Sequence, residues 1–409
     1  MKKFNQYIVE SKNTHMEHLD DLIFNEGVTG TRKAINFLQD LRDMLAGSTS
    51  GAISTTVKWD GAPAVFAGID PSDGQFFVAK KGVFNKNPKV YKTPADVKAD
   101  TSGDLQKKLL IALKEFSKLG IKKGVFQGDL MFTKGDVAKE TIDGQKYYTF
   151  QPNTIVYAVP VNSDLGRQIA RASIGIVWHT SYTGRTFESM SAAFGKNITK
   201  NFKKSATIWQ DDANFRDVSG NATFTKKETA EVTAILANVG KIFQKIPGKL
   251  LDEFKNDEEL RMRTKTFNNT FVRAGKAIEP RSHVSKLMNY IYDYYQKEID
   301  AKKQEKTKAA WKEKQKDAMR IFTAYKKSDI ENIFVLMNLL VDAKEMVINK
   351  MNQAAAMGTF LRTSSGFKVT DQEGYVAIDH MSNDAIKIVN RLEFSRANFS
   401  KDVIKGWQK

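Results

Sequence analysis

The chain has 409 residues, enough for two or three domains, and its hydrophobic fraction of 41% can supply a sizeable core. This composition excludes a mostly disordered chain, and the lack of cysteine excludes disulfide scaffolds, cysteine-ligated metals and thiol catalysis. Lysine and arginine number 64 against 47 aspartates and glutamates, so the formal net charge is +17. The excess favours an anionic partner, with nucleic acid first, although many basic proteins have no such partner.

The sequence predicts a protein without a membrane-spanning segment, because no run of about 18 apolar residues is present. The N-terminus, Met-Lys-Lys-Phe-Asn-Gln, continues into polar residues and lacks the apolar core of a secretion signal. The absence of cysteine suits a reducing compartment. We therefore expect a cytoplasmic protein, and we expect it to be a monomer.

The first part of the chain mixes helical and strand patterns. Apolar side chains recur at helical spacing over residues 31–46 and again over 104–119. Strand patterns bounded by turn residues occur at 52–57, 64–68, 75–79, 123–132, 146–151, 154–159 and 173–180. We therefore expect residues 1–185 to form a domain on a largely antiparallel sheet.

The pattern becomes almost entirely helical from about residue 226 to 357, and apolar residues from Ile330 to Ile348 line one face of a long helix. Strand patterns return at 366–369, 374–378 and 385–389. We expect the strands of the two ends to share a sheet. The predicted fold class is therefore α+β, with residues 1–185 and 358–409 as one domain and 186–357 as a mostly helical insertion.

The segment most suggestive of chemistry is Val57-Lys58-Trp59-Asp60-Gly61, where a lysine follows a strand and precedes a tight turn. A lysine that attacks phosphorus must be uncharged, whereas its free pKa is roughly 10.4, so burial or nearby cations must lower that pKa. Lys80 and Lys81 are candidate cations. Taken alone, so short a motif is more often an ordinary surface lysine beside a turn.

Lys58-Trp59-Asp60-Gly61 resembles the first motif of the covalent nucleotidyltransferases, the superfamily of ATP-dependent DNA ligases, RNA ligases and mRNA capping enzymes. Later segments resemble that superfamily's further motifs in the same order, within 52–182 and 366–395: Lys80-Lys81-Gly82, Phe126-Gln127-Gly128-Asp129-Leu130, Ile174-Gly175-Ile176-Val177-Trp178-His179-Thr180, Gln372-Glu373-Gly374-Tyr375-Val376 and Ala385-Ile386-Lys387-Ile388-Val389. The chain also looks like ligase-like proteins of large tailed bacteriophages, which would place it in the cytoplasm of a bacterial host.

The resemblance implies an antiparallel-sheet nucleotidyltransferase (adenylation) domain and a role for each matching residue. Lys58 would attack the α-phosphorus of ATP, and Glu373 would bind Mg²⁺, or Mn²⁺ in its place, with Asp129 as a second ligand. Lys387 would neutralise charge on the transferred phosphate. The residues implied in nucleotide binding are Val57, Asp60, Gly61, Lys80, Lys81, Asp129, Trp178, His179 and Lys387.

Several positions depart from the superfamily's pattern. Pro63 replaces a frequent arginine, Asp129 replaces a glutamate, and Val389 replaces the second lysine of the last motif, for which Arg391 could substitute. Only about 20 residues follow that motif, too few for the oligonucleotide-binding barrel that often follows it. These departures bear on the efficiency of nucleotide transfer and on the identity of the nucleotide.

The resemblance implies an ATP-dependent polynucleotide ligase that seals 5′-phosphate and 3′-hydroxyl ends through a lysyl-AMP intermediate. The substrate would be nicked DNA, RNA or a hybrid, with a slight leaning towards RNA. One alternative is another covalent nucleotidyltransferase, which caps an end or adenylylates a protein. The second is a catalytically degenerate phage protein that binds nucleic acid or is structural.

The helical insertion mixes basic and aromatic residues over 286–327, a combination that suits a nucleic-acid groove. The equally weighted alternative is a helical face with aromatic residues in its core and solvated lysines outside. If the groove exists, its candidate phosphate ligands are Lys302, Lys303, Lys306, Lys308 and Lys312.

Overall fold

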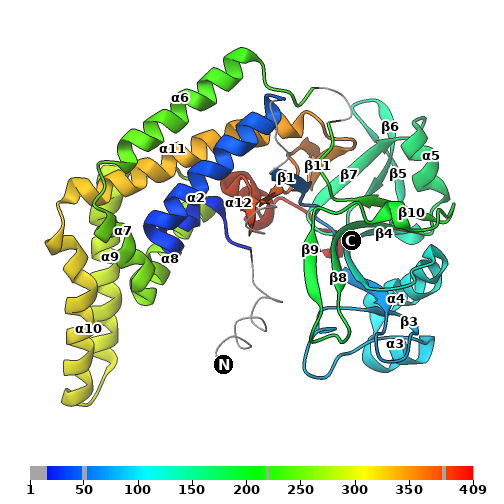
Figure 1. Cartoon of the computed structure of the whole chain (residues 1–409), viewed down its shortest axis with the longest axis horizontal. Helices are drawn as coiled ribbons and strands as arrows, with labels where there is room; N and C mark the ends of the chain where they lie inside the picture. Colours follow the sequence, from blue (N-terminus) through cyan, green and yellow to red (C-terminus); the bar gives the residue numbers. More distant parts are fainter. Residues whose placement is uncertain (1–15, 48–52, 218–220, 380–383, 409) are drawn as a thin grey trace.

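The computed structural model describes residues 16–47, 53–217, 221–379 and 384–408. Its helices are α2 (Leu22–Leu45), α3 (Pro94–Asp100), α4 (Gly103–Phe116), α5 (Asp164–Arg171), α6 (Lys226–Phe243), α7 (Gly248–Asn256), α8 (Glu258–Arg273), α9 (Pro280–Ala301), α10 (Glu305–Ala324), α11 (Lys327–Asn352) and α12 (Arg391–Phe399). Figure 1 shows an elongated molecule, with the sheets at one end and an arm formed by α2 and α6 to α11 at the other.

A three-stranded antiparallel sheet joins the two ends of the chain. Its strands, in spatial order, are β1 (Ile53–Val57), β13 (Tyr375–Asp379) and β14 (Asp384–Ile388). The sequence predicted that strands from the two ends share a sheet, and the pairing of Val57 with Tyr375 confirms it. Tyr375, Ala377 and Ile388 belong to the same hydrophobic cluster as the helical arm, so the arm covers one face of this sheet.

A larger sheet carries the middle motifs. Its strands, in order, are β10 (Ile208–Asp212), β8 (Ile174–Thr183), β4 (Val125–Thr133), β2 (Ala64–Ile69) and β3 (Phe76–Ala79), and β9 (Ser191–Phe194) also pairs with β8. The β8–β10 pair is parallel and the other pairs of this sheet are antiparallel. Leu130, Ile176 and Trp178 pack on α4 from one face. Side chains alternate along a strand, so Asp129 and His179 project from the other face.

A third, antiparallel sheet again pairs segments from both ends of the chain. Its order is β12 (Gly366–Val369), β11 (Gly358–Thr363), β7 (Ile155–Pro160), β6 (Gln145–Phe150) and β5 (Ala138–Ile142). The pairing of β11 with β7 places the segment after the helical arm beside the loop 151–154. The mixed α+β class with antiparallel sheets is therefore present.

The structure shifts two of the expected domain boundaries. Strands β9 and β10 lie beyond residue 185 but belong to the larger sheet, so the helical part of the insertion begins at α6. Helix α2 precedes the sheets in sequence, yet its apolar face is buried with α6, α7 and α11 in one cluster. Burial of that face decides which layer the helix joins, and local sequence does not specify the partner.

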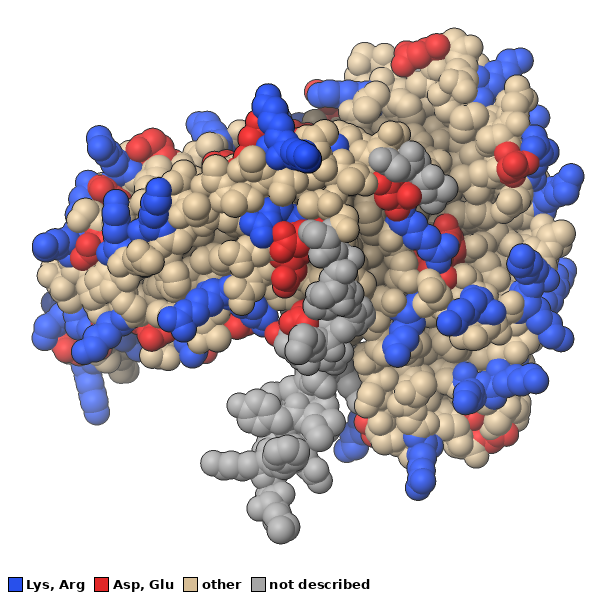
Figure 2. All heavy atoms as spheres, turned by 45° about the horizontal axis from the view of Figure 1, so that its top comes forward, with Lys and Arg blue, Asp and Glu red and all other residues tan. Residues whose placement is uncertain are grey.

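The described helices include none that is long and apolar enough to cross a membrane. Basic side chains are distributed over both the arm and the sheet-containing end in Figure 2, with acidic side chains between them. On the face that Figure 2 shows, the net charge therefore does not locate a binding surface by itself.

Candidate active site

Lys58 follows the last residue of β1 and lies beside the chain that enters β13. Its backbone N–H donates a hydrogen bond of 2.8 Å to the carbonyl oxygen of Gly374. This pairing sets the Lys58 side chain next to Glu373, and the Lys58 ammonium forms an ion pair with the Glu373 carboxylate. The Lys58 side chain is 32% exposed and that of Glu373 only 10%, so the amine is accessible while the carboxylate is mostly covered.

Two glycines permit the close approach of these segments. Gly374 has a φ of +144°, and a Cβ there would lie 2.7 Å from Val389 Cγ2. A Cβ on Gly61 would lie 2.6 Å from the Cβ of Asp129. Any side chain at either position would displace the neighbouring strand. The glycines therefore hold the Lys58 turn against β4 and hold Glu373 against the end of β14.

Asp129 and His179 project from neighbouring strands β4 and β8 towards Lys58. The Asp129 Oδ2 lies 3.8 Å from the His179 Nε2. Burial raises the pKa of Asp129 to about 7, and the positive charge of Lys58 opposes that rise. Burial, followed by the charge of Lys58, lowers the pKa of His179 to about 4, so the imidazole is neutral at pH 7. The same surroundings raise the pKa of Glu373 to about 7, with burial first.

Lys387 reaches the same region from β14. It pairs with Val376, which pairs in turn with Thr56 of β1, so Lys387 and Lys58 lie on the same face of the small sheet. Burial lowers the pKa of Lys387, and the charge of Lys58 lowers it further. The structure thus brings together Lys58, Asp129, His179, Glu373 and Lys387.

Asp60 does not lie where the nucleotide-binding role implied by the resemblance would require it. Its side chain accepts hydrogen bonds from Asn153 Nδ2 (2.7 Å) and from the backbone N–H groups of Thr154 (2.6 Å) and Ile155 (2.7 Å). The residue is only 4% exposed, and burial raises the pKa of its carboxyl against those hydrogen bonds. Asp60 therefore anchors the Lys58 turn to the loop before β7.

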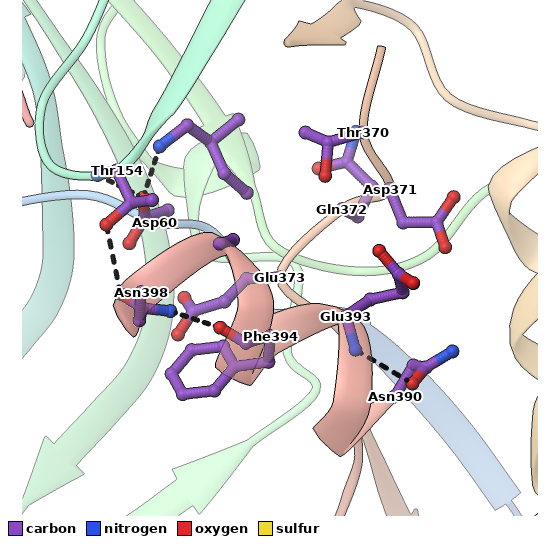
Figure 3. Close-up of a pocket in the computed structure, with 12 residues that line it drawn as sticks. Asp60, Thr154, Thr370, Asp371, Gln372, Glu373, Asn390, Glu393, Phe394 and Asn398 are labelled. Carbon is purple, nitrogen blue, oxygen red and sulfur yellow. Dashed lines mark hydrogen bonds between the residues drawn. The ribbon is translucent and has the colours of Figure 1, made fainter. Parts of the chain in front are cut away.

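A narrow pocket with a cavity volume of about 20 Å³ opens beside Asp60 and Glu373. Figure 3 shows Phe394 and Asn398 of α12 on one side of it, close to the Glu373 side chain, and Asp371 and Glu393 farther along. The Oε1 atom of Gln372, another lining residue, is buried without a hydrogen-bond partner among the described residues. The C-terminal helix thus forms a wall next to the proposed site.

Lys80 and Lys81, the two candidate cations, have different surroundings. Lys80 forms an ion pair of 2.9 Å with Asp100, on which Lys89 and Tyr91 also converge, so its charge is engaged away from Lys58. Lys81 is exposed, and its charge acts on Asp129. Of the two, Lys81 is the one whose charge reaches the site.

Trp178 is not available to stack on a nucleotide base. It is fully buried, its rings lie 5.4 Å from Phe116 and 5.5 Å from Phe202, and its Nε1 donates to Gln210. Its neighbour His179 projects from the opposite face of β8. The expectation for Trp178 is therefore corrected, and His179 alone of this pair faces Lys58.

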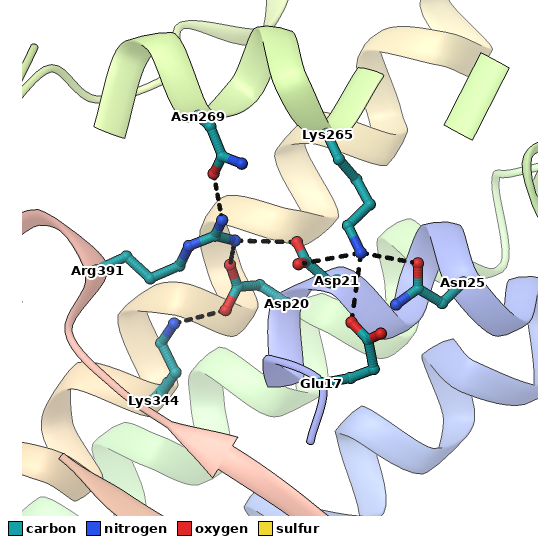
Figure 4. Close-up of polar contacts among 8 residues, drawn as sticks. All are labelled: Glu17, Asp20, Asp21, Asn25, Lys265, Asn269, Lys344 and Arg391. Carbon is teal, nitrogen blue, oxygen red and sulfur yellow. Dashed lines mark hydrogen bonds and ion pairs between the residues drawn. The ribbon is translucent and has the colours of Figure 1, made fainter. Parts of the chain in front are cut away.

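Arg391, which could have replaced the missing second lysine, is engaged elsewhere. Figure 4 shows its guanidinium between Asn269 of α8 and the carboxylates of Asp20 and Asp21. Asp20 also pairs with Lys344 of α11 at 2.7 Å, and both side chains are almost fully buried. This network joins the N-terminal segment, the helical arm and the end of β14.

The lysines expected to bind nucleic acid lie on the α9–α10 hairpin. Lys302 pairs with Glu298 and lies 4.7 Å from the Trp311 ring centre, and Lys308 pairs with Glu305. Lys303, Lys306 and Lys312 are exposed. Most aromatic residues of this segment are buried or packed against the core, namely Tyr290, Tyr294, Tyr295, Trp311, Phe322 and Tyr325. The hairpin therefore presents charge with few exposed rings.

Sequence patterns missed the residues that hold the Lys58 turn. Asn153 supports the Asp60 carboxylate, and the Tyr157 hydroxyl accepts the Asp60 N–H at 2.8 Å. They lie more than 90 residues from Asp60 and have no motif of their own. Val57, by contrast, is a strand residue whose N–H donates to Ala213 O.

The site offers two carboxylates that could hold a divalent cation. No group of three or more histidine, aspartate or glutamate side chains in the described ranges is placed to hold a metal ion. Mg²⁺ commonly takes one or two carboxylates together with phosphate oxygens and water. Glu373 and Asp129 can supply the carboxylates, and a polyphosphate would have to supply the remaining oxygens.

The geometry defines a mixed α+β protein with an accessible lysine among carboxylates and a second cation, at the meeting of two sheets. The chain belongs to a family described only as "Family of unknown function (DUF6267)", which matches residues 13–403. Comparisons with curated proteins and with solved structures found no match. The family assignment thus spans both the sheets and the helical arm.

Proposed function

We propose that the protein is an ATP-dependent polynucleotide ligase that acts through a lysyl-AMP intermediate. The observation that carries the proposal is the ion pair of Lys58 with Glu373, at a point that Asp129 and Lys387 also face. These four residues come from segments up to about 330 residues apart in a chain of 409. The order of these residues along the chain and their positions on strands also agree with the motifs of the covalent nucleotidyltransferases that the sequence resembles.

The first step would form the bond between enzyme and nucleotide. Lys58 Nζ, after losing its proton to water, attacks the α-phosphorus of ATP. A nitrogen–phosphorus bond forms while the oxygen bridge to the β-phosphate breaks, and pyrophosphate leaves with the bonding electrons. An oxygen of the 5′-phosphate of a polynucleotide then attacks the AMP phosphorus, which breaks the nitrogen–phosphorus bond and restores the Lys58 amine. The 3′-hydroxyl of the adjacent end attacks the activated 5′-phosphate, and AMP leaves as the ends are sealed.

The surrounding residues would position the nucleotide and balance its charge. Lys387 and Lys81 would face phosphate oxygens, and His179 would offer a neutral ring close to Asp129. Glu373 and Asp129 would hold Mg²⁺, which neutralises charge on the polyphosphate. Asp60 would keep the lysine turn in place from behind, because its carboxylate is used in hydrogen bonds to the loop 153–155.

Intact-protein mass spectrometry after incubation with ATP and Mg²⁺ tests the proposal. The native chain should gain the mass of one AMP, and Lys58→Ala should gain none. Lys80→Ala is the matched control, because Lys80 pairs with Asp100 away from the site. A labelled chain should then transfer AMP to, and seal, nicked DNA or RNA. Absence of label with ATP and GTP would favour a degenerate protein, and transfer to a 5′-diphosphate end or to a protein would favour the other nucleotidyltransferases.

A further inference from the structure

Exposed aromatic rings gather in the C-terminal segment of the chain. Among the large hydrophobic side chains exposed in the described ranges are Phe394 (38%), Phe399 (62%) and Trp407 (67%), all within 14 residues of one another. Exposed aromatic rings cost free energy in water unless a partner covers them. A concentration of three in so short a segment therefore indicates a contact surface.

Internal contacts hold the C-terminal segment against α12. Thr154 donates its hydroxyl to Asn398, the neighbour of Phe399, at 3.0 Å. Asn153, the neighbour of Thr154, accepts the N–H of Gly406 at 2.7 Å, and Gly406 precedes Trp407. Lys405 also donates its ammonium to the carbonyl of Ala397. The segment that carries Trp407 is therefore fastened next to the end of α12 that carries Phe399.

Basic side chains accompany the rings. The Arg273 guanidinium lies 5.6 Å from the Phe399 ring centre, and Arg396 lies against Gly275 at the end of α8. Lys276 and Lys401 are exposed in the same two segments. We call Phe394, Phe399, Trp407, Arg273, Arg396 and Lys401 the C-terminal aromatic surface. Three of these residues are basic, although Arg396 forms an ion pair of 2.8 Å with Glu393, and Asp402 is an exposed acid next to Lys401.

The surface continues into the proposed active site. Phe394 lines the same pocket as Asp60 and Glu373, and Figure 3 shows its ring beside the Glu373 side chain. Glu373 forms an ion pair with Lys58, so a ligand that extends past Phe394 would come close to Lys58. The α9–α10 hairpin lacks this continuity, and most of its rings are in the core.

We infer that the C-terminal aromatic surface binds the single-stranded end of a polynucleotide, with bases stacked on Phe399 and Trp407 and phosphates on Arg273, Arg396 and Lys401. Stacking on exposed rings combined with a basic track is how single strands are bound without sequence preference. The inference deepens the proposed function, since it assigns the surface that delivers the strand to Lys58. DNA and RNA share this chemistry, so both are used in the test.

Fluorescence anisotropy with a labelled 12-mer of oligo-dT and one of oligo-rU measures the binding. Phe399→Ala and Trp407→Ala should each weaken the affinity at least about fivefold, the lower range for loss of one stacked base. Arg273→Gln should reduce the slope of log affinity against log salt by about 0.7, as expected for one lost phosphate contact. Met262→Ala on α8 and Tyr292→Ala on α9 are matched controls, because those side chains are 52% and 47% exposed and do not belong to the C-terminal aromatic surface.

Thermal melting of each variant checks the fold, and these substitutions should leave it intact since the side chains are exposed. Unchanged affinity in Phe399→Ala and Trp407→Ala, equal losses in the control variants, or no binding by the native chain would overturn the inference. Lys58→Ala separates the two proposals, because it should abolish AMP attachment and still bind both oligonucleotides. Oligonucleotide binding without AMP attachment in the native chain would refute the proposed function alone.

Discussion

Gly406 and Asp60 are linked through a single residue, Asn153, which accepts the Gly406 N–H with its carbonyl and donates its side-chain amide to the Asp60 carboxylate. The C-terminal segment thereby supports the turn that carries Lys58. A Cβ on Gly406 would lie only 2.3 Å from the carbonyl oxygen of Gln151. The position accepts no side chain without a shift of the loop 151–154.

Gly406→Ala should therefore slow AMP attachment, by about tenfold, and lower the free energy of unfolding by about 1–3 kcal/mol, the usual cost of overpacking. The rate of label incorporation and urea unfolding measure the two effects. Gly135→Ala is the control, because no atom of the residues that the structure describes lies within 4 Å of a Cβ there. Equal behaviour of the two variants would show that the C-terminal segment does not support the site.

Glu373→Gln should abolish most nucleotide transfer while it preserves the fold. The substitution keeps the size of the side chain and removes the charge that pairs with Lys58. Loss of a charged group that acts on a transferring phosphate costs about a hundredfold or more. The measurement is the initial rate of AMP attachment. Asp371→Asn removes a charge from the same pocket without contact to Lys58, and its rate should stay within about threefold of the native one. A similar loss in both variants would contradict a specific role for Glu373.

We expect His283 to make the folded chain less stable in acid. It is 1% exposed among Phe267, Phe271 and Phe334, with Asn268 Oδ1 2.7 Å from its Nε2. Burial, followed by the charge of Lys286, lowers its pKa from 6.5 to about 4, against an opposing effect of Glu279. The unfolded chain therefore binds a proton more readily than the folded one, and stability falls as pH drops from about 6.5 towards 4.

The expected contribution of His283 over this window is about 3 kcal/mol, since one pKa unit corresponds to about 1.4 kcal/mol. Urea unfolding of the native chain and of His283→Gln, at several pH values, measures the difference. Other groups with shifted pKa values, including His18 and His179, are present in both proteins and cancel. Parallel pH profiles of the two proteins would refute the prediction.

We expect the stability of the folded chain to depend strongly on the buried ion pair that Lys344 forms. Although burial opposes it, the charges of Lys344 and Arg391 hold the pKa of Asp20 below its usual range. Lys344→Met should lower the free energy of unfolding by about 3–5 kcal/mol, because Asp20 loses a partner in the interior. Adding Asp20→Asn should restore part of that loss. Urea unfolding of the native chain, the two single variants and the double variant gives the coupling free energy between the two residues. Additive losses would mean that the pair is not coupled. Lys316→Met is the exposed control.

Local patterns located many of the strands but not the faces that they present. The segments around Lys58, Asp129, Glu373 and Lys387 were predicted as strands or strand ends, and they are. Strands β9 and β10 and helix α12 were not predicted, because they are short and their regular structure depends on other elements, as in the pairing of both strands with β8. Pairing across the two ends followed from the return of strand patterns after the helical region. The register of that pairing, which sets Lys58 opposite Gly374, could not be predicted from those patterns.

Residue chemistry and spacing were sufficient to single out Lys58 and its companions, because the chemical properties of a side chain and the period of a strand are local. Burial and partners belong to the folded chain. Packing on α4 removes Trp178 from the site, Asp100 engages Lys80, and the network around Asp20 engages Arg391. Asn153 and α12 join the site for the same reason, since contacts between residues 93 and 244 positions apart depend on how the layers pack.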